Sequence, residues 1–163
     1  MSDLRAYAQL TRLPNLPTAL ADICLGALAA GALPHHALAF AALLPASACL
    51  YSAGMVWNDY FDREQDRRER PFRPLPSGRL SSRQAARLGA ALLVAGVLLA
   101  LPAGTTALGI AVCLVGAITA YDGWLKRTWA GPLAMGTCRF LNVLLGVSAC
   151  GSLLGPRGVH LAA

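Results

Sequence analysis

Oxygen-bearing side chains gather just after a long apolar stretch, with Asn58, Asp59, Asp62 and Asp66 at helical spacing. Because neither Gly nor Pro lies between Met55 and Asp66, we expect the helix to continue through Asp66 and to project the three carboxylates from one face. Like charges so close together repel one another, and a divalent cation would relieve that repulsion. Magnesium prefers oxygen ligands and completes its shell with water and substrate phosphate, so the pattern predicts Mg²⁺ with a phosphate-bearing ligand.

A solvated helix end is the alternative interpretation, with the acids paired to the neighbouring Arg63, Arg67 and Arg70. The position beside an apolar stretch, the added Asn58 and the third carboxylate of Asp66 favour a metal site over that interpretation.

The surrounding composition is typical of a membrane protein. Hydrophobic residues make up 56% of the 163 residues, charged residues only 13%, and mean hydropathy is +0.51. Soluble domains average roughly 45–50% apolar and 25% charged residues. Apolar stretches near the ~20 residues that cross a bilayer predict an all-α, multi-helix integral membrane bundle. We expect about five transmembrane helices, near residues 16–33, 37–57, 84–101, 105–121 and 132–154.

The net charge of +6 does not indicate a nucleic-acid partner. Seven of the fourteen basic residues lie between Arg63 and Arg83, in one connection that also holds acids and prolines. The positive-inside rule places the amino terminus and the charged loops in the cytoplasm, and the end after Arg157 outside. In a bacterium this predicts the inner membrane. The cysteines are scattered singly and offer no metal or redox pair.

Four segments together resemble the UbiA superfamily of intramembrane polyprenyl-diphosphate transferases. The first signature of that family resembles residues 58–66 (NDYFDREQD) followed by 70–78 (RPFRPLPSG). The resemblance extends to residues 12–15 (RLPN) before the first span and to 121–127 (YDGWLKR) after the fourth.

The resemblance implies a role for each matching residue. The magnesium ligands would be Asn58, Asp59, Asp62 and Asp66, and the diphosphate would be held by Arg67, Arg73, Lys126 and Arg127. Asp59, Asp62 and Lys126 would be catalytic, and Arg12 would contact the diphosphate or an acidic acceptor. Each basic residue could instead set topology or contact lipid headgroups.

Three polar residues lie inside apolar spans, where ionisable groups usually face a cavity or a partner. Arg139 and Asn142 are three residues apart and would share a helix face, so they could orient an acceptor. A helix–helix salt bridge between Arg139 and Asp22 is the alternative.

The resemblance implies that the chain transfers an isoprenyl group from a polyprenyl diphosphate to a lipophilic or aromatic acceptor within the membrane, with Mg²⁺, and that the acceptor is most often aromatic. Family members carry a second aspartate motif, but Asp122 is the only acid after Glu69 here. We therefore expect one domain, 1–163, that covers the first half to two-thirds of the family fold and is incomplete at its carboxyl end. A second chain could supply the missing motif. A non-catalytic scaffold or partner subunit and a small transporter are the alternatives.

Overall fold

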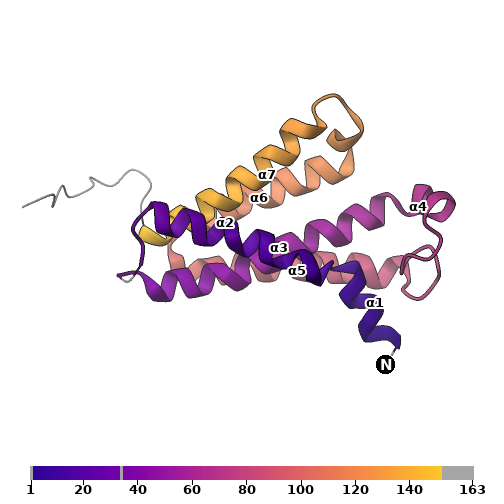
Figure 1. Cartoon of the computed structure of the whole chain (residues 1–163), viewed down its shortest axis with the longest axis horizontal. Coiled ribbons are helices and arrows are strands. Elements are labelled where there is room, and N and C mark those ends of the chain that lie inside the picture. Colours follow the sequence, from indigo (N-terminus) through magenta and orange to yellow (C-terminus); the bar gives the residue numbers. More distant parts are fainter. Residues whose placement is uncertain (1, 34, 152–163) are drawn as a thin grey trace, which may run out of the picture.

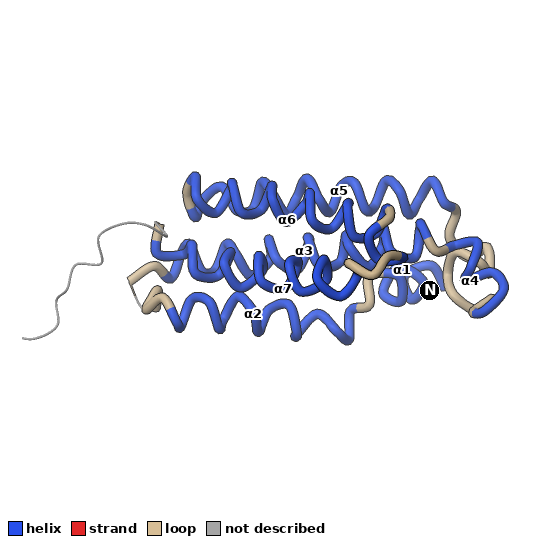
Figure 2. The backbone as a smooth tube through the Cα atoms, turned by 90° about the horizontal axis from the view of Figure 1, so that it is seen from above, coloured by secondary structure: helices blue, strands red, loops and turns tan. Residues whose placement is uncertain are grey.

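The chain folds into a bundle of helices that run roughly along one axis (Figure 2). A computed structural model describes residues 2–33 and 35–151, and this part of the chain contains no strand. The α-helices are α1 (Ser2–Leu10), α2 (Leu16–Ala29), α3 (Ala37–Phe61), α4 (Arg63–Glu69), α5 (Ser82–Ala100), α6 (Thr105–Gly123) and α7 (Gly131–Val147). Short 3-10 helices are η1 (Leu13–Asn15), η2 (Leu101–Ala103), η3 (Leu125–Arg127) and η4 (Ser148–Cys150).

The helical membrane bundle predicted from composition is confirmed. Four helices in the described residues are long and apolar enough to cross a bilayer: Ala37–Phe61, Ser82–Ala103, Thr105–Gly123 and Gly131–Cys150. The first predicted span is shorter, because the apolar helix Leu13–Ala29 falls below the length of the others. The 14 residues of α2 rise only ~21 Å at 1.5 Å per residue, less than the ~30 Å of hydrocarbon.

Helix boundaries follow local capping. Ser81 begins α5 with a capping box, since its Oγ accepts from the Gln84 backbone N–H at 3.2 Å and its own N–H donates to Gln84 Oε1 at 2.8 Å. The helix therefore begins two residues before the predicted 84. The last predicted helix ends in η4, and its expected end at Leu154 lies outside the described residues.

Glycines allow α2 and α7 to approach closely. A side chain on Gly26 would meet the Val143 carbonyl oxygen, and one on Gly146 would meet the Ile23 carbonyl oxygen. In lipid, where burial of apolar surface does not drive association, such small residues permit backbone contact. This contact fixes α2 against α7, and Figure 2 shows the two helices side by side.

A separate apolar cluster ties α1 and the loop after α4 to the ends of α3 and α5. Its buried members are Ala6, Leu10, Val56, Leu75, Leu80 and Ala85. The cluster brings the segments that carry Arg12 and Arg73 to the same end of α3.

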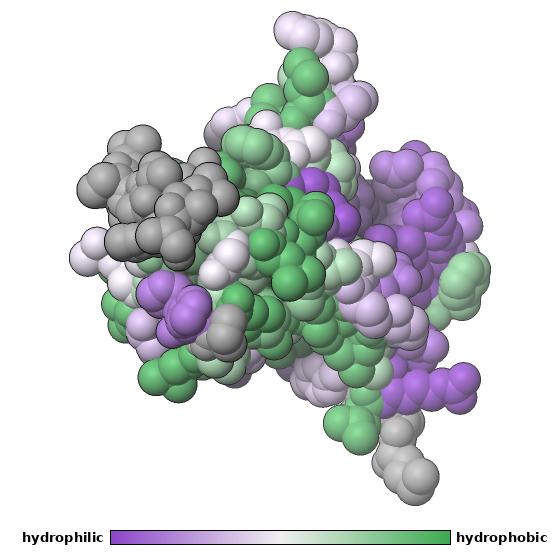
Figure 3. Space-filling model, turned by 60° about the vertical axis from the view of Figure 1, so that its left-hand side comes forward, coloured by the Kyte–Doolittle hydropathy of each residue, from purple (hydrophilic) through white to green (hydrophobic). Residues whose placement is uncertain are grey.

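The charged segments lie at one end of the bundle. In Figure 1 the amino terminus, α4 and the connection between α6 and α7 all lie toward the right. Figure 3 shows strongly hydrophilic residues gathered mainly along one side of the visible face, and hydrophobic residues over much of its middle. The molecule therefore has a polar end and an apolar body, as a membrane protein requires.

Candidate active site

Acidic and basic side chains from six segments meet at the polar end of the bundle. We call this group the charge cluster, and its ionised members are Arg12, Asp59, Asp62, Asp66, Arg70, Arg73, Asp122, Lys126 and Arg127. They come from the linker before η1, the end of α3, α4, the following loop, the end of α6 and η3.

The helix that carries the acids does not continue unbroken, so this part of the prediction is wrong. The first helix, α3, ends at Phe61, and Asp62 has φ −89° and ψ 1° before α4 begins. The neighbouring packing prevails over local helix propensity, because Asp62 turns toward η3 and Asp66 turns toward the loop after α4.

Asp59 and Asp66 are joined through a shared arginine. Arg73 Nη1 lies 3.2 Å from Asp59 Oδ1 and 2.7 Å from Asp66 Oδ2. Arg12 Nη2 lies 3.0 Å from the same Asp59 oxygen, and Arg70 Nη1 lies 3.8 Å from Asp66. Both carboxylates are buried, so these arginines compensate charge that water no longer solvates.

Arg12 reaches Asp59 from a left-handed backbone conformation, with φ 51° and ψ 46°. Among the described residues it is the one non-glycine residue with positive φ. This conformation costs roughly 1–2 kcal/mol and turns the chain between α1 and η1. Its ion pair with Asp59 helps to hold the strained turn in place.

Asp62 belongs to a second group, built around Lys126. Lys126 Nζ lies 2.8 Å from Asp62 Oδ2 and 4.0 Å from Asp122 Oδ1, and it donates to the Asn58 carbonyl oxygen at 3.4 Å. Arg127 Nη2 lies 3.3 Å from Asp62 Oδ1. The predicted Asn58, Asp62, Lys126 and Arg127 therefore meet in space.

Asp122 is the member that sequence reasoning left without a role. Its Oδ1 accepts from Asn58 Nδ2 at 3.2 Å, and the residue is only 2% exposed. The available signals were its place beside Tyr121 in the 121–127 segment and its isolation as the last acid of the sequence.

Arg67 lies apart from the charge cluster. Its Nη1 pairs with Glu64 Oε2 at 3.1 Å, and the two side chains are 65% and 66% exposed. Its predicted contact with diphosphate stays a prediction.

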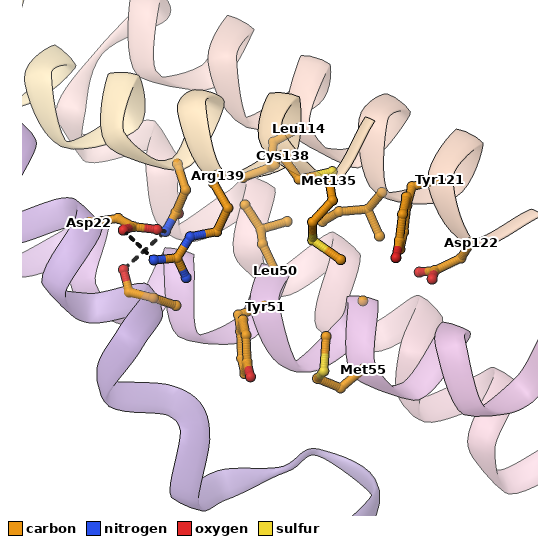
Figure 4. Close-up of a pocket in the computed structure, with 14 residues that line it drawn as sticks. Asp22, Leu50, Tyr51, Met55, Leu114, Tyr121, Asp122, Met135, Cys138 and Arg139 are labelled. Atoms are coloured by element: carbon orange, nitrogen blue, oxygen red, sulfur yellow. Dashed lines mark hydrogen bonds and ion pairs between the residues drawn. The ribbon is translucent and has the colours of Figure 1, made fainter. Parts of the chain in front are cut away.

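A cavity of about 90 Å³ extends into the membrane-spanning region from the charge cluster. Its wall is formed by α2, α3, α6 and α7, with apolar side chains that include Leu50, Met55, Leu114 and Met135. Figure 4 shows Tyr121 and Asp122 toward one end and the pair of Asp22 and Arg139 toward the other.

The far end of the cavity holds a second polar group, which we call the polar network: Asp22, Ser47, Arg139 and Asn142. Arg139 Nη2 donates to Asp22 Oδ1 at 2.8 Å, so the helix–helix salt bridge considered as the alternative to an acceptor contact is present. Asn142 Nδ2 donates to Asp22 Oδ2 at 3.2 Å, and Asn142 Oδ1 accepts from Ser47 Oγ at 2.7 Å. The network links α2, α3 and α7.

The donor chemistry of the charge cluster suits magnesium, although the described residues contain no group of three His, Cys, Asp or Glu side chains close enough to hold a metal by themselves. Magnesium usually takes one or two protein carboxylates and receives its remaining oxygens from water and phosphate. Asn58, Asp59 and Asp62 supply such oxygens, and the surrounding cations could pair with a phosphate. The residues therefore fit a magnesium ion that arrives with its phosphate ligand.

Known proteins match this chain along most of its length. It is 36% identical over 154 residues to a digeranylgeranylglyceryl phosphate synthase of Ignicoccus hospitalis, covering 93% of this chain and 50% of that protein. It is 31% identical to the synthase of the same name in Sulfolobus acidocaldarius, with 93% and 55% covered. The chain thus spans about half the length of the curated relatives it matches.

A solved structure described as digeranylgeranylglyceryl phosphate synthase in membranes superposes with a TM-score of 0.86 at 31% identity, covering 91% of this chain and 54% of that one. The model of the UbiA prenyltransferase family matches residues 16–163, which contain both the aspartate segment and the lysine of η3. With sequence, fold and family model in agreement, this integral membrane chain belongs to the UbiA prenyltransferase family.

Proposed function

We propose that the charge cluster binds the diphosphate of a Mg²⁺-bound polyprenyl diphosphate, and that the prenyl group is transferred to an acceptor in the adjoining cavity. Asp122 carries this proposal, because it contacts Asn58 in the charge cluster and also lines the cavity. Ionic groups beside an apolar hollow suit a substrate with a charged head and a hydrocarbon body.

The balance of charge supports binding of metal and diphosphate together. Five cations face four carboxylates in the charge cluster, a formal excess of one positive charge. Mg²⁺ alone would add to that excess, whereas the anionic diphosphate offsets it. Asn58, Asp59 and Asp62 would hold the metal. Asp66 stays a predicted ligand, and its ion pair with Arg73 gives it a positioning role as well.

The reaction breaks the allylic carbon–oxygen bond, and the electron pair leaves with the diphosphate. Arg73, Lys126 and Arg127 would stabilise the negative charge that develops on the leaving oxygens, because preorganised donors are most effective where charge appears. Bound Mg²⁺ would supply Lewis-acid stabilisation of the same oxygens. The acceptor donates an electron pair to the allylic carbon and loses a proton, and the apolar wall excludes water from the cation.

Two classes of acceptor suit this chemistry. The family resemblance predicts an aromatic acceptor. The name of the relatives specifies a product, a glyceryl phosphate with two geranylgeranyl groups, so the corresponding acceptor is a glyceryl phosphate that already carries one. The relatives favour geranylgeranyl diphosphate as donor substrate in either case. Turnover further requires the second aspartate motif of the family. We propose that this motif is supplied by residues outside 1–163 or by a second chain.

The orientation proposed from charge places the polar end in the cytoplasm. The Arg12 linker, the 62–82 connection and the η3 loop share that end, and together they hold most of the basic residues. The positive-inside rule therefore favours a cytoplasmic amino terminus.

Reconstitution of the 163-residue chain in lipid nanodiscs tests the proposal. Geranylgeranyl diphosphate should bind more tightly with Mg²⁺ than with EDTA, and variants Asp59→Ala and Asp62→Ala should lose that difference. Release of diphosphate should then be measured with each acceptor class, with and without a co-expressed family member. Equal binding with Mg²⁺ and EDTA would contradict the proposal and favour a non-catalytic scaffold. Magnesium flux into liposomes without diphosphate binding would favour a transporter.

A further inference from the structure

We propose that Arg139 determines acceptor specificity by donating hydrogen bonds to an uncharged oxygen at the deep end of the cavity. Asp22 and Asn142 position Arg139. The inference rests on the proposed function, because the acceptor is the second substrate of that reaction.

The hydrogen-bonding capacity of Asn142 is already used within the polar network. Its Nδ2 donates to the Ala19 carbonyl oxygen at 3.0 Å and to Asp22 Oδ2 at 3.2 Å, while its Oδ1 accepts from Ser47 Oγ at 2.7 Å. The residue is 7% exposed. Asn142 therefore holds α7 against α2 and α3, and its predicted contact with the acceptor would require breaking these bonds.

Arg139 differs from Asn142 in that its donors are only partly used. A guanidinium has five N–H donors, and within the described residues one bond to Asp22 at 2.8 Å engages it. Its side chain is 48% exposed and lines the cavity, where Figure 4 shows it projecting between α7 and Tyr51. The remaining N–H groups of Arg139 face a cavity inside the membrane-spanning region, where a hydrogen bond to an oxygen atom would stabilise them.

The ion pair with Asp22 decides which oxygen suits this site. Arg139 and Asp22 together are neutral, so an uncharged carbonyl, hydroxyl or ether oxygen completes the hydrogen bonding and adds no charge. An anion here would leave a net negative charge inside the membrane-spanning region, beside the Asp22 carboxylate. An isoprenoid tail would cover the guanidinium without returning a hydrogen bond. The deep end therefore belongs to the acceptor.

The distance along α7 from the charge cluster to Arg139 gives the length of an acceptor that can contact both. A side chain on Gly131 would lie 3.1 Å from the Lys126 carbonyl oxygen, so the helix begins beside the charge cluster. Arg139 follows eight residues later, about 12 Å along the axis. Leu50, Met55 and Leu114 line the intervening wall. The fitting molecule has an apolar body, a nucleophile at one end and an uncharged oxygen at the other, on the order of 10 Å apart.

A pair of nearly isosteric probes separates charge from shape: 6-hydroxy-2-naphthamide and 6-hydroxy-2-naphthoate. Dissociation constants are measured by calorimetry with the 163-residue chain in nanodiscs. The amide should bind about tenfold more tightly than the carboxylate, as a single charge-assisted hydrogen bond allows. The double variant Asp22→Asn, Arg139→Gln keeps the polar contact neutral and should lose about tenfold in affinity for the amide. Thr137→Val, on the same helix but outside the cavity, should leave it unchanged.

Charge reversal distinguishes a binding residue from a structural ion pair. Asp22→Arg with Arg139→Asp keeps an ion pair but moves the guanidinium to α2. The swap also breaks the bond that Asn142 Nδ2 donates to Asp22, so affinity is measured on the folded fraction, where it should fall about tenfold for the amide. Retained affinity would overturn the inference. Tighter binding of the naphthoate, or no binding of either probe, would also overturn it. Mg²⁺-dependent binding of geranylgeranyl diphosphate is measured on the same samples, and its absence from wild type would contradict the proposed function alone.

Discussion

The charge cluster and the polar network both pair carboxylates with cations, but they differ in net charge and in exposure to solvent. The charge cluster has one more cation than carboxylate, and its cations range from 9% exposed at Lys126 to 61% exposed at Arg127. The polar network pairs one cation with one carboxylate, and Asn142 and Ser47 close the bonds between the helices, whereas Arg139 keeps N–H donors toward the cavity. A positive net charge suits an anionic ligand, whereas a neutral ion pair suits a contact between helices and, at the free donors of Arg139, an uncharged ligand.

Their positions explain this difference. The exposed members of the charge cluster lie at helix ends and in loops, where water and headgroups replace broken contacts at modest cost, whereas Asp59, Asp66 and Asp122 are buried. The polar network lies within membrane-spanning helices, where a broken polar contact has no such replacement. Ligand exchange is therefore easier in the charge cluster, and we expect substitutions of its more exposed members, such as Asp62 and Arg127, to change binding more than folding.

The largest expected effect is on magnesium dependence. Asp62→Asn removes a proposed metal ligand but leaves Lys126 and Arg127 free to attract diphosphate. We expect the enhancement of geranylgeranyl diphosphate binding by Mg²⁺ to fall about hundredfold, while binding in EDTA stays equal or increases. Calorimetry in nanodiscs measures both. Glu64→Gln, on the exposed face of α4, is the matched control. An unchanged enhancement would remove Asp62 from the metal site.

The second effect concerns the contact that supports the polar network. Gly26→Leu would drive a side chain into the backbone of α7, where the Val147 nitrogen lies only 2.8 Å from the place that a Cβ atom would take. We expect a loss of about 1–3 kcal/mol in the free energy of unfolding, as overpacking produces. Gly136→Leu, which faces open space on α7, should lose little. Unfolding in detergent measures both, and equal losses would contradict a close α2–α7 contact.

The third effect concerns the polar network itself. Asn142→Leu keeps the branched shape of the side chain but removes three hydrogen bonds. We expect a loss of about 1–2 kcal/mol, in the range of hydrogen bonds between membrane helices. Binding of Mg²⁺-geranylgeranyl diphosphate by the folded fraction should stay within twofold of wild type. If binding fell as far as in Asp62→Asn, the two polar groups would not be independent.

The sequence predicted these two regions unequally. Length and hydropathy located the spans because both are local properties, and the helical spacing of Arg139 and Asn142 correctly indicated one face. The break at Asp62, the left-handed turn at Arg12 and the place of Asp122 depend on partners 47 to 65 residues away. The spacing of residues along one helix does not predict such contacts. The carboxylates therefore do not share the single predicted face but form two groups, around Arg73 and Lys126.

The smallest effect separates two arginines to which the sequence pattern gives the same role. Arg67 pairs with Glu64 in solvent, so Arg67→Gln should change stability by less than about 0.5 kcal/mol and diphosphate affinity by less than twofold. Arg73 is 20% exposed and bridges two buried carboxylates, so Arg73→Gln should weaken binding about tenfold. Titration of both variants with Mg²⁺ and geranylgeranyl diphosphate measures the contrast. Equal losses of affinity in the two variants would contradict this contrast. They would indicate that Arg67 leaves Glu64 to contact the ligand and that the charge cluster extends along α4.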